Sequence, residues 1–469
     1  MEKTHYFPPD KKSHVVVIGA GFSGLTAAYR LYQQGYENIE IYEARGRVGG
    51  RVFSVGINGP REETIVELGG QNIPDGGDAT YLRALAQELK LSLLEDEIEI
   101  KQVFYDHETQ SYIDIFKLQK ELIPLKERTS LKSKIQSLAI QARNMDEVLL
   151  ALFPDKGILY RSLVFKFAAY EGGIPRNVSP EAWENLYYML CGGLASVHAT
   201  NKIKRAKITG GNARLALEIA QKLQGHIHLS CPLKSMSTAE NNRLLLAFEG
   251  GYQKECDKVI LTIPCSTYQN IQIDPLLIPE ERMKFIQRVP YGDNTKIIIP
   301  IDLNTLNVNS IMTDDVGLFF SQDSDSCTLY FSGEAGRTLK CYLKERYAEA
   351  LMTLKAIYPS IIFQTGLPFI ANDNNQLATY DGPVTHFWVD DPYARGSYSY
   401  RSPHMKAEIN VIKDYKGERV RLPYSPVNDH IFFAREHTAI QTDFGTLEGA
   451  VESGERAARL VLASDSAVP

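Results

Sequence analysis

The chain has 469 residues, of which 44% are hydrophobic and 23% charged, and its formal net charge is −6. This length and composition are those of a globular protein with two domains, and a mildly acidic chain without a basic block is not expected to bind nucleic acid. No apolar run approaches the roughly 18 residues that a membrane span needs, so we expect no transmembrane segment.

The cysteines and the N-terminus bear on the compartment. Six cysteines are scattered along the chain without a C-x-x-C pair, which is typical of reduced packing residues in a reducing environment. The first twelve residues are polar and contain Pro8 and Pro9, so they do not resemble the apolar segment of a signal peptide. The sequence therefore predicts a cytoplasmic protein. Export by a route that needs no signal stays open, as does a homodimer.

The first predicted elements form a βαβ unit. Residues 15–18 are an apolar run expected as a buried parallel strand, a helix is predicted over 22–34, and a second strand over 39–42 leads to Glu43. Between the first strand and the helix, the three glycines of a G-x-G-x-x-G pattern are Gly19, Gly21 and Gly24. Such glycines allow a tight turn, close approach of a diphosphate and close helix packing, while the acid about 20 residues on accepts hydrogen bonds from a ribose. This stretch predicts a dinucleotide site.

Two glycine-rich stretches follow the acid. Residues 43–51 read Glu-Ala-Arg-Gly-Arg-Val-Gly-Gly-Arg, and residues 66–72 read Val-Glu-Leu-Gly-Gly-Gln-Asn. On composition alone, Arg45, Arg47 and Arg51 are expected in a solvated basic loop. A nicotinamide site needs no such extension.

With these motifs the sequence resembles the flavin-containing amine oxidase family, which includes monoamine, polyamine and L-amino acid oxidases. The resemblance implies that FAD is the cofactor, that R-x-G-G-R runs along it, and that the paired glycines lie under the flavin. The positions that it assigns to FAD in this part of the chain are Gly19, Gly21, Phe22, Ser23, Gly24, Glu43, Ala44, Arg45, Gly49, Gly50, Arg51, Leu68, Gly69, Gly70 and Gln71.

The middle of the chain is predicted to be largely helical from about residue 79 to 205. The expected helices cover residues 80–89, 131–143, 144–153 and 179–190. Gly192 and Gly193, with residues 195–198, are expected to form a loop that lines a cavity.

Strand character then returns near Ile203, before a helix predicted over residues 212–223. Further strands are predicted at residues 227–229, 244–248 and 256–263. The resemblance implies that this block returns to the FAD domain, with the backbone of Leu233 beside the adenine and Pro264 beside the cofactor. For Leu233, an ordinary leucine at a strand end is the alternative.

Lys296 begins a predicted strand over residues 296–300, five residues after Tyr291. A single lysine at a strand start is most often solvated. The resemblance changes this interpretation, because in the family a Y-G-x-x-x-K strand start carries its lysine to the flavin, where it holds a water against N5. It therefore implies that Lys296 is catalytic, and burial there would lower its pKa.

Residues 301–380 contain predicted strands at 318–320 and 328–331 and a helix at 344–357. The segment from Asn372 to Asn375 is interpreted as a polar loop and not as a metal site. His226 and His228 lack companion ligands at useful spacing, so no metal site is predicted.

A second specific motif runs from Trp388 to Tyr400 as W-x-x-D-P-Y-x-R-G-S-Y-S-Y. It is similar to the polyamine oxidase and demethylase branch of the family. The resemblance implies that Tyr398 flanks the substrate side of the flavin, where its ring would orient an amine, and that Trp388 shapes the substrate cavity. Ser397 stands where monoamine oxidases carry the cysteine that bonds the flavin. Serine cannot form that thioether, so the sequence predicts non-covalent FAD.

The C-terminal motif covers a predicted strand near residue 431, an acid, and a helix after residue 446. The resemblance assigns Glu436, Thr446 and Leu447 to the cofactor and Phe444 to the substrate cavity. Arg435 stands where the family usually has glycine, which puts the local backbone and phosphate contacts in doubt. Phe444 and Thr446 stand where monoamine oxidases place a second cage tyrosine, which favours the polyamine and amino-acid oxidases.

Together these features predict an α/β fold. A Rossmann-type FAD-binding domain would be assembled from discontinuous residues 1–80, 205–290 and 388–469, and an α+β substrate domain from residues 81–204 and 291–387. The implied function is an FAD-dependent amine oxidase that converts a primary or secondary amine, including a polyamine, to an imine and reduces O2 to hydrogen peroxide.

Two alternatives stay open. An L-amino acid oxidase would need a cation for the substrate carboxylate, for which Arg176, Arg205 and Arg395 are candidates. A non-catalytic protein that retains FAD is favoured by Arg435 alone.

Overall fold

The computed structural model describes residues 13–74, 79–99, 101–191, 202–302, 309–321, 325–364, 366–442 and 444–466. The first twelve residues and the predicted loop around Gly192 and Gly193 lie outside these ranges. In the described part of the chain, no helix has both the length and the apolar character needed to cross a membrane. All six cysteines are free.

A five-stranded parallel sheet forms around the first predicted strand. Its strands, in spatial order, are β10 (Ile227–His228), β2 (Ile39–Tyr42), β1 (Val15–Ile18), β14 (Lys258–Leu261) and β25 (Ile431–Phe433). β1 and β14 are buried along their whole length, as expected for strands that are covered on both faces. The predicted α/β class with a Rossmann-type sheet is confirmed, and the sheet joins segments far apart in the chain.

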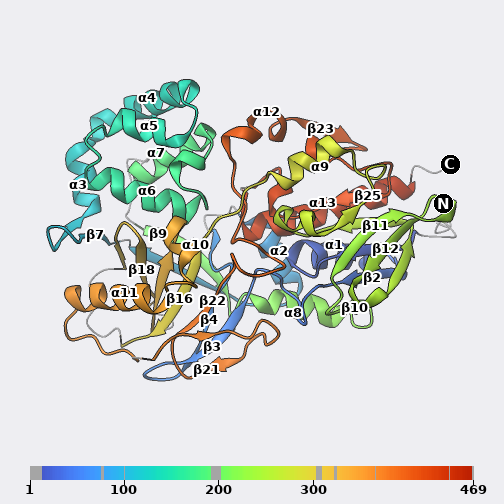
Figure 1. Ribbon diagram of the computed structural model, residues 1–469, viewed down its shortest axis with the longest axis horizontal. Coiled ribbons are helices and arrows are strands. Elements are labelled where there is room, and N and C mark those ends of the chain that lie inside the picture. The colour runs from blue at the N-terminus through green and yellow to red at the C-terminus, as the bar shows by residue number, and fades with distance from the viewer. Residues whose placement is uncertain are drawn as a thin grey trace, which may run out of the picture.

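Three helices pack beside this sheet: α1 (Phe22–Gln33), α8 (Ala213–Lys222) and α13 (Leu447–Ser466). α1 begins after Gly21, whose extended backbone leads out of β1, and the chain turns away at Gly35. Small residues let α1 and α13 approach each other, since a Cβ added to Gly454 would lie only 2.4 Å from the carbonyl oxygen of Ser23. The first and last helices of the chain are therefore neighbours (Figure 1).

A four-stranded sheet packs on another face of the parallel sheet. Its strands are β13 (Gln253–Cys256), β12 (Leu244–Phe248), β11 (Leu233–Thr238) and β15 (Gln272–Ile273). Met236, Leu246 and helix α9 (Glu280–Gln287) share a core with Val16 and Val259. The predicted strand at 244–248 is confirmed, whereas β11 shows that Leu233 begins a strand.

The largest sheet has eight strands and mixed direction. In spatial order they are β20 (Phe369–Ile370), β22 (Val384–His386), β16 (Thr295–Pro300), β19 (Ser326–Phe331), β18 (Val316–Ser321), β17 (Ser310–Met312), β7 (Gln102–Asp106) and β8 (Ser111–Asp114). Helices α10 (Gly333–Thr338) and α11 (Leu343–Ile357) pack against it through Ala335, Tyr347 and Leu354. The register places Lys296 opposite Tyr330 on one side and His386 on the other.

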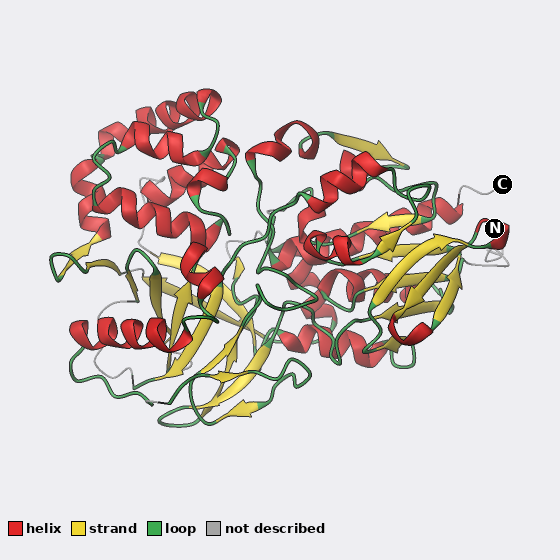
Figure 2. Cartoon of the chain, viewed as in Figure 1, coloured by secondary structure: helices red, strands yellow, loops and turns green. Residues whose placement is uncertain are grey.

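A group of helices lies above the eight-stranded sheet in the view of Figure 2. It comprises α3 (Ile115–Leu122), α4 (Arg128–Gln141), α5 (Met145–Leu152), α6 (Ile158–Tyr170) and α7 (Trp183–Cys191). The helices predicted at 131–143, 144–153 and 179–190 are confirmed with small shifts in their bounds, as is α2 (Thr80–Glu88) elsewhere.

The expectation that residues 79–205 are largely helical is wrong between residues 93 and 114. This stretch forms β6 (Leu93–Glu99), β7 and β8. β6 pairs along its whole length with β9 (Lys202–Ile208), so that an acid-rich strand is aligned with a base-rich one.

Several short elements complete the chain: β3 (Ser54–Asn58), β4 (Glu63–Glu67), β5 (Ile73–Pro74), β21 (Thr379–Tyr380), β23 (Ile412–Tyr415), β24 (Glu418–Arg421) and α12 (Lys406–Ile409). The β3–β4 hairpin ends at Leu68 and delivers the paired glycines to the interior. β21 pairs with β3 although the predicted division places them in different domains. The division into two domains stays a prediction.

Candidate functional site

A cavity of about 950 Å³ runs from the turn after β1 to the eight-stranded sheet. Nearly all the residues assigned to the cofactor or the substrate line it, and all of them belong to the described part of the chain. Gly24 is the exception. A Cβ on Gly24 would lie 2.0 Å from the carbonyl oxygen of Gly19, so this glycine lets α1 pack against the turn. Segments from both ends of the sequence thus meet at one cavity.

The glycine turn has the features that a diphosphate needs. Gly19 has φ +107, a conformation that favours glycine, and a Cβ on Gly21 would meet nothing within 4 Å. No side chain caps the N-terminus of α1, which leaves its N–H groups to other partners. Oε2 of Glu43 accepts a 2.7 Å hydrogen bond from the backbone N–H of Ala20, and Oε1 accepts a 2.9 Å hydrogen bond from the backbone N–H of Arg45. The residues present therefore fit a dinucleotide.

The arginines of the next stretch are buried, so the solvated-loop interpretation is wrong for Arg45 and Arg47. Two nitrogens of Arg45 lie 2.6 and 2.7 Å from the carboxylate of Asp391, and Arg45 also bonds Asp373. His386 lies 3.1 Å from Asp391. Asp373, His386 and Asp391 bring three potential metal ligands together, but both carboxylates are already bonded to arginine. The guanidinium of Arg45 thus ties segments of the chain together.

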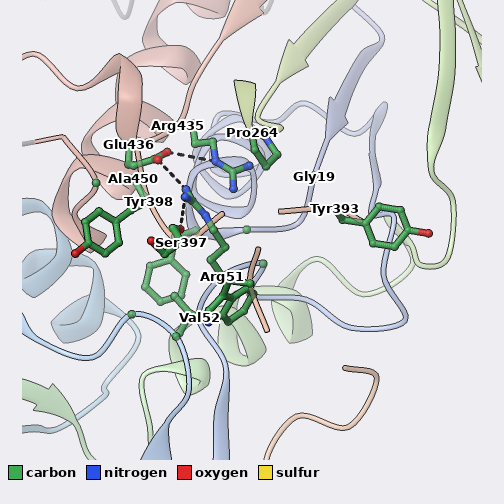
Figure 3. Close-up of a pocket in the computed structure, with 18 of the residues that line it drawn as sticks. Gly19, Arg51, Val52, Pro264, Tyr393, Ser397, Tyr398, Arg435, Glu436 and Ala450 are labelled. Atoms are coloured by element: carbon green, nitrogen blue, oxygen red, sulfur yellow. Dashed lines mark hydrogen bonds and ion pairs between the residues drawn. The ribbon is translucent and has the colours of Figure 1, made fainter. Parts of the chain in front are cut away.

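Two guanidinium groups share one carboxylate further along the cavity (Figure 3). Nη2 of Arg51 lies 2.8 Å from Oε1 of Glu436, and its Nη1 donates to the carbonyl of Ser397 at 2.6 Å. Nε of Arg435 lies 3.3 Å from Oε2 of the same acid. Burial alone would raise the pKa of Glu436, but the charge of Arg51, a hydrogen bond with His437 and the charge of Arg435 hold it well below its usual range. Glu436 is therefore ionised.

Arg435 has the backbone conformation of a glycine. Its φ is +147 and its ψ is 172, in a region that residues with a side chain rarely adopt. Burial and the positive charge of Arg51 lower the pKa of Arg435 to about 10. Arg435 thus has a backbone conformation that glycine would adopt at this position, and its side chain adds a cation to the cavity lining.

Lys296 reaches the cavity from β16. Its Nζ donates to the carbonyl oxygens of Glu67 at 3.0 Å and Gly69 at 2.8 Å, and to Oε1 of Gln71 at 3.0 Å. The residue is only 8% exposed, so the interpretation as a solvated lysine is wrong. Burial lowers its pKa to about 7 although the charge of Glu67 opposes this.

Glu67 lies behind Lys296 and was given no role from sequence. Its Oε1 accepts a 2.7 Å hydrogen bond from the backbone of Asn212, and its carboxylate accepts hydrogen bonds from Ser54 Oγ, the shorter of 2.8 Å. Burial raises the pKa of Glu67. The acid is thus held rigidly at the end of β4, and its backbone carbonyl positions the lysine amine.

Tyr398 closes the other side of this end of the cavity. Its hydroxyl donates to the carbonyl of Ala169 and accepts a 2.6 Å hydrogen bond from Nδ2 of Asn294. The hydroxyl of Tyr330 lies 3.5 Å away. Burial raises the pKa of Tyr398 well above its usual value, so the phenol stays neutral. The ring is fixed through its hydroxyl.

Asn294 and Tyr330 are residues that sequence reasoning missed. Asn294 lies directly before β16, two residues from Lys296, so its place next to the predicted strand start was a signal that could have found it. Tyr330 depends on the register between β16 and β19, which no local pattern reveals.

The aromatic residues assigned to the substrate also line the cavity. Trp388 is almost fully buried and donates from Nε1 to the carbonyl of Leu68 at 2.9 Å. The ring of Phe444 lies 4.9 Å from the guanidinium carbon of Arg401 and 5.1 Å from that of Arg421. Further side chains at this end are Phe319, Phe320, Ser321, Thr328 and Tyr330.

The remaining assigned residues lie at two other points of the lining. Thr446 and Leu447 are at the start of α13, where Oγ1 of Thr446 accepts a 3.0 Å hydrogen bond from the backbone of Gly449. Leu233 and Pro264 also line the cavity, and Pro264 lies near Arg435 (Figure 3). Of the three candidate cations, Arg205 lines this cavity, whereas Arg176 and Arg395 do not.

Comparison with known proteins gives one consistent result. A family model described as flavin containing amine oxidoreductase matches residues 22–462. The chain is 26% identical to amine oxidase [flavin-containing] A of Sus scrofa, over 96% of this chain and 84% of that protein. It is 25% identical to the L-amino-acid oxidase of Mus musculus, over 96% of this chain and 70% of that protein.

Solved structures agree at the level of the fold. Putrescine oxidase bound to putrescine superimposes with a TM-score of 0.70 at 20% identity, covering 97% of this chain and 100% of that chain. Cyclohexylamine oxidase from Brevibacterium oxydans IH-35A gives a TM-score of 0.71 at 17% identity, covering 97% of this chain and 99% of that chain. The α/β fold expected from sequence is that of these enzymes.

Proposed function

This chain belongs to the family of flavin containing amine oxidoreductases, whose cofactor is FAD, and we propose that it oxidises a primary or secondary amine to an imine while O2 becomes hydrogen peroxide. The amine loses two electrons and two protons, and O2 takes up both. Water then hydrolyses the imine to a carbonyl compound and releases the amine nitrogen. FAD, when bound, supplies the acceptor for the hydrogen and electrons that leave the carbon beside the nitrogen.

The observation that carries this proposal is the meeting of Lys296 and Tyr398 in one cavity with the glycine turn. A protein that merely retained FAD would have no need to bury a lysine amine at this end. Against a non-catalytic role, the lysine is surrounded by three hydrogen-bond acceptors and has its pKa lowered to about 7. A dry, rigid environment of this kind is typical of catalytic groups.

We assign separate tasks to the two residues. Lys296 would position a water molecule, because its amine is fixed by Glu67, Gly69 and Gln71. Tyr398 would orient the amine with its ring face, since its hydroxyl is already bonded to Ala169 and Asn294. Neither task requires the phenol to ionise.

The substrate end favours an amine with one charge and an apolar substituent. Among the described residues of the lining, the carboxylates are Glu43, Glu249 and Glu436. Glu43 is bonded to the glycine turn, Glu249 lies 3.3 Å from Lys234, and Glu436 is paired with Arg51. Since each is already bonded, the described part of the lining offers no free carboxylate to the several ammonium groups of a polyamine, and a polyamine is the less favoured amine here.

A second candidate, an L-amino acid oxidase, is favoured by Arg205. This residue lines the cavity and would offer a cation to a carboxylate. The similarity to the mouse L-amino-acid oxidase is consistent with this candidate.

The test mixes the oxidised protein anaerobically with separate pools of monoamines, polyamines and L-amino acids and follows the flavin absorbance. We expect bleaching by the monoamine pool, and peroxide on admission of air. If only the L-amino acid pool bleaches the flavin, and Arg205→Met abolishes that bleaching, the protein is an L-amino acid oxidase. Bound FAD that no pool bleaches would contradict both and support a structural flavin.

We further propose a cytoplasmic location for the protein, and non-covalent FAD. The six free cysteines support a reducing compartment. Fractionation of the source cells tests the location, and light scattering distinguishes a monomer from a homodimer.

A further inference from the structure

The backbone of Arg435 is exceptional in the described chain. The other described non-glycine residues with positive φ lie between +39 and +61, in the ordinary left-handed region. Arg435, at φ +147 and ψ 172, lies in a region that belongs essentially to glycine. A side chain held in such a conformation is maintained by the structure around it, which raises the question of what the guanidinium does.

Two contacts fix Arg435 beside the glycine turn. Its Nη1 donates to the carbonyl of Thr262 at 2.7 Å, and Thr262 Oγ1 donates to the carbonyl of Ile18 at 2.8 Å. Its backbone N–H donates to Ser453 Oγ at 2.9 Å, and Ser453 Oγ lies 3.2 Å from Ser23 Oγ on α1. The guanidinium is therefore linked to β1 through Thr262, and the backbone of Arg435 is linked to α1 through Ser453.

The local charge is unbalanced. Arg51 and Arg435 both lie against Glu436, so that two partly buried cations share one buried anion. His437, the neighbouring titratable group, has its pKa lowered by burial and is neutral near pH 7. Nε of Arg435 makes no hydrogen bond besides its 3.3 Å ion pair with Glu436. A surplus positive charge that lines the cavity next to a helix N-terminus is suited to bind an anion.

We propose that Arg435 binds the diphosphate of FAD and that cofactor binding offsets the strained backbone. The apoprotein then carries both the strain and an uncompensated charge, whereas in the holoprotein the diphosphate would neutralise the charge and its binding would offset the strain. The proposal rests on FAD as the cofactor and is independent of the amine that is oxidised.

Three variants separate strain from charge. Arg435→Gly removes both, Arg435→Ala keeps the strain and removes the charge, and Arg435→Lys keeps both. For each apoprotein, the measurements are the thermal midpoint, the Kd for FAD by quenching of flavin fluorescence, and the Kd for ADP by calorimetry.

We expect Arg435→Gly to raise the midpoint of the apoprotein while it weakens FAD binding about tenfold or more, the loss of one charge-assisted contact. ADP binding should weaken by the same factor. Arg435→Ala should lose affinity without gaining stability, and Arg435→Lys should stay within a few-fold of the unmodified protein.

Equal FAD affinity in Arg435→Gly and the unmodified protein would overturn the proposal, and tighter binding would show that Arg435 obstructs the cofactor. If Arg435→Gly fails to fold, the comparison of Arg435→Ala with Arg435→Lys decides alone. If FAD binding depends on Arg435 but the protein oxidises no amine, the role of Arg435 stands and only the proposed function is refuted.

Discussion

Single residues at the substrate end combine burial with hydrogen bonding, and Lys296 is the clearest case. Below its pKa of about 7, the three N–H groups of its ammonium match the acceptors Glu67 O, Gly69 O and Gln71 Oε1. Above it, the neutral amine has a lone pair that can accept a hydrogen bond from water. The protonation state therefore decides whether a water can be held.

This leads to a prediction for Lys296→Met. Anaerobic reduction of the flavin should slow about 10²-fold or more, the range of a lost positioning or acid–base group, while FAD stays bound. In the unmodified protein the rate should rise as the pH increases through about 7, because the proton that occupies the amine is lost. That rise should be absent from the variant in stopped-flow measurements.

Lys166 on α6 supplies a matched control for Lys296. It is also buried, burial lowers its pKa to about 8, and it does not line the cavity. Lys166→Met should keep the pH profile of the unmodified protein. A profile that stays unchanged in Lys296→Met would remove the lysine from the reaction.

At the scale of elements, two glycines near the turn between β1 and α1 have different tasks. Gly24 allows close packing of the backbone, and Gly21 leaves space for a ligand. A Cβ on Gly24 would lie 2.0 Å from the backbone oxygen of Gly19, whereas a Cβ on Gly21 would enter open cavity. We expect Gly24→Ala to destabilise the apoprotein by about 1–3 kcal/mol or more, because backbone must move.

Gly21→Ala is the matched partner of this prediction. Its backbone, with φ −75 and ψ 178, accepts alanine, so stability should change by about 1 kcal/mol or less. FAD affinity should nevertheless fall, since the added methyl group occupies space near the diphosphate. Urea unfolding of the apoproteins and FAD titration measure the two effects. Equal losses of stability in both variants would contradict the assignment.

Elements could be predicted from sequence where a local pattern decides them. The apolar strand of residues 15–18, its glycines and α1 follow from spacing and turn chemistry, and they agree with the structure. α6 (Ile158–Tyr170) was not predicted because its apolar residues surround the helix and leave no single stripe. The site could be predicted motif by motif, but the pairing of Lys296 with Tyr330 depends on strand register.

At the scale of the whole molecule, a buried ion cluster joins the loop after β2 to segments more than 300 residues away. Asp391 lies between Arg45 and His386 and is almost fully buried. Burial would raise the pKa of Asp391, but His386 and Arg45 outweigh burial and hold it well below its usual value. The folded state therefore favours the ionised acid.

Asp391→Asn should cost about 3–5 kcal/mol of unfolding free energy near pH 7, because Arg45 is left buried without its main partner. The sign of the pH dependence follows from the lowered pKa. Stabilisation by Asp391 is present above the ordinary pKa of about 3.9 and is lost as the pH falls below it. Urea unfolding between pH 3 and 6 should show this loss in the unmodified protein. A slope of equal size in the variant would place the effect elsewhere.

The last prediction concerns the cofactor as a link across the molecule. The cavity is lined by residues of β1, β16 and α13 and of the segment directly after β14, so FAD would hold together segments that are distant in sequence. Ser397 offers a hydroxyl and no thiol at the predicted attachment position, and its Oγ has no hydrogen-bond partner. We therefore expect acid precipitation to leave a colourless pellet with all the FAD in the supernatant.

Added FAD should stabilise the apoprotein by about 2.7 kcal/mol at 100 times Kd. ADP, which fills only part of the cavity, is the control: at the same concentration as FAD it should stabilise the apoprotein less, because it binds more weakly. A pellet that stays yellow would mean a covalent bond to another residue, and an apoprotein indifferent to FAD would mean that its segments are held together without the cofactor.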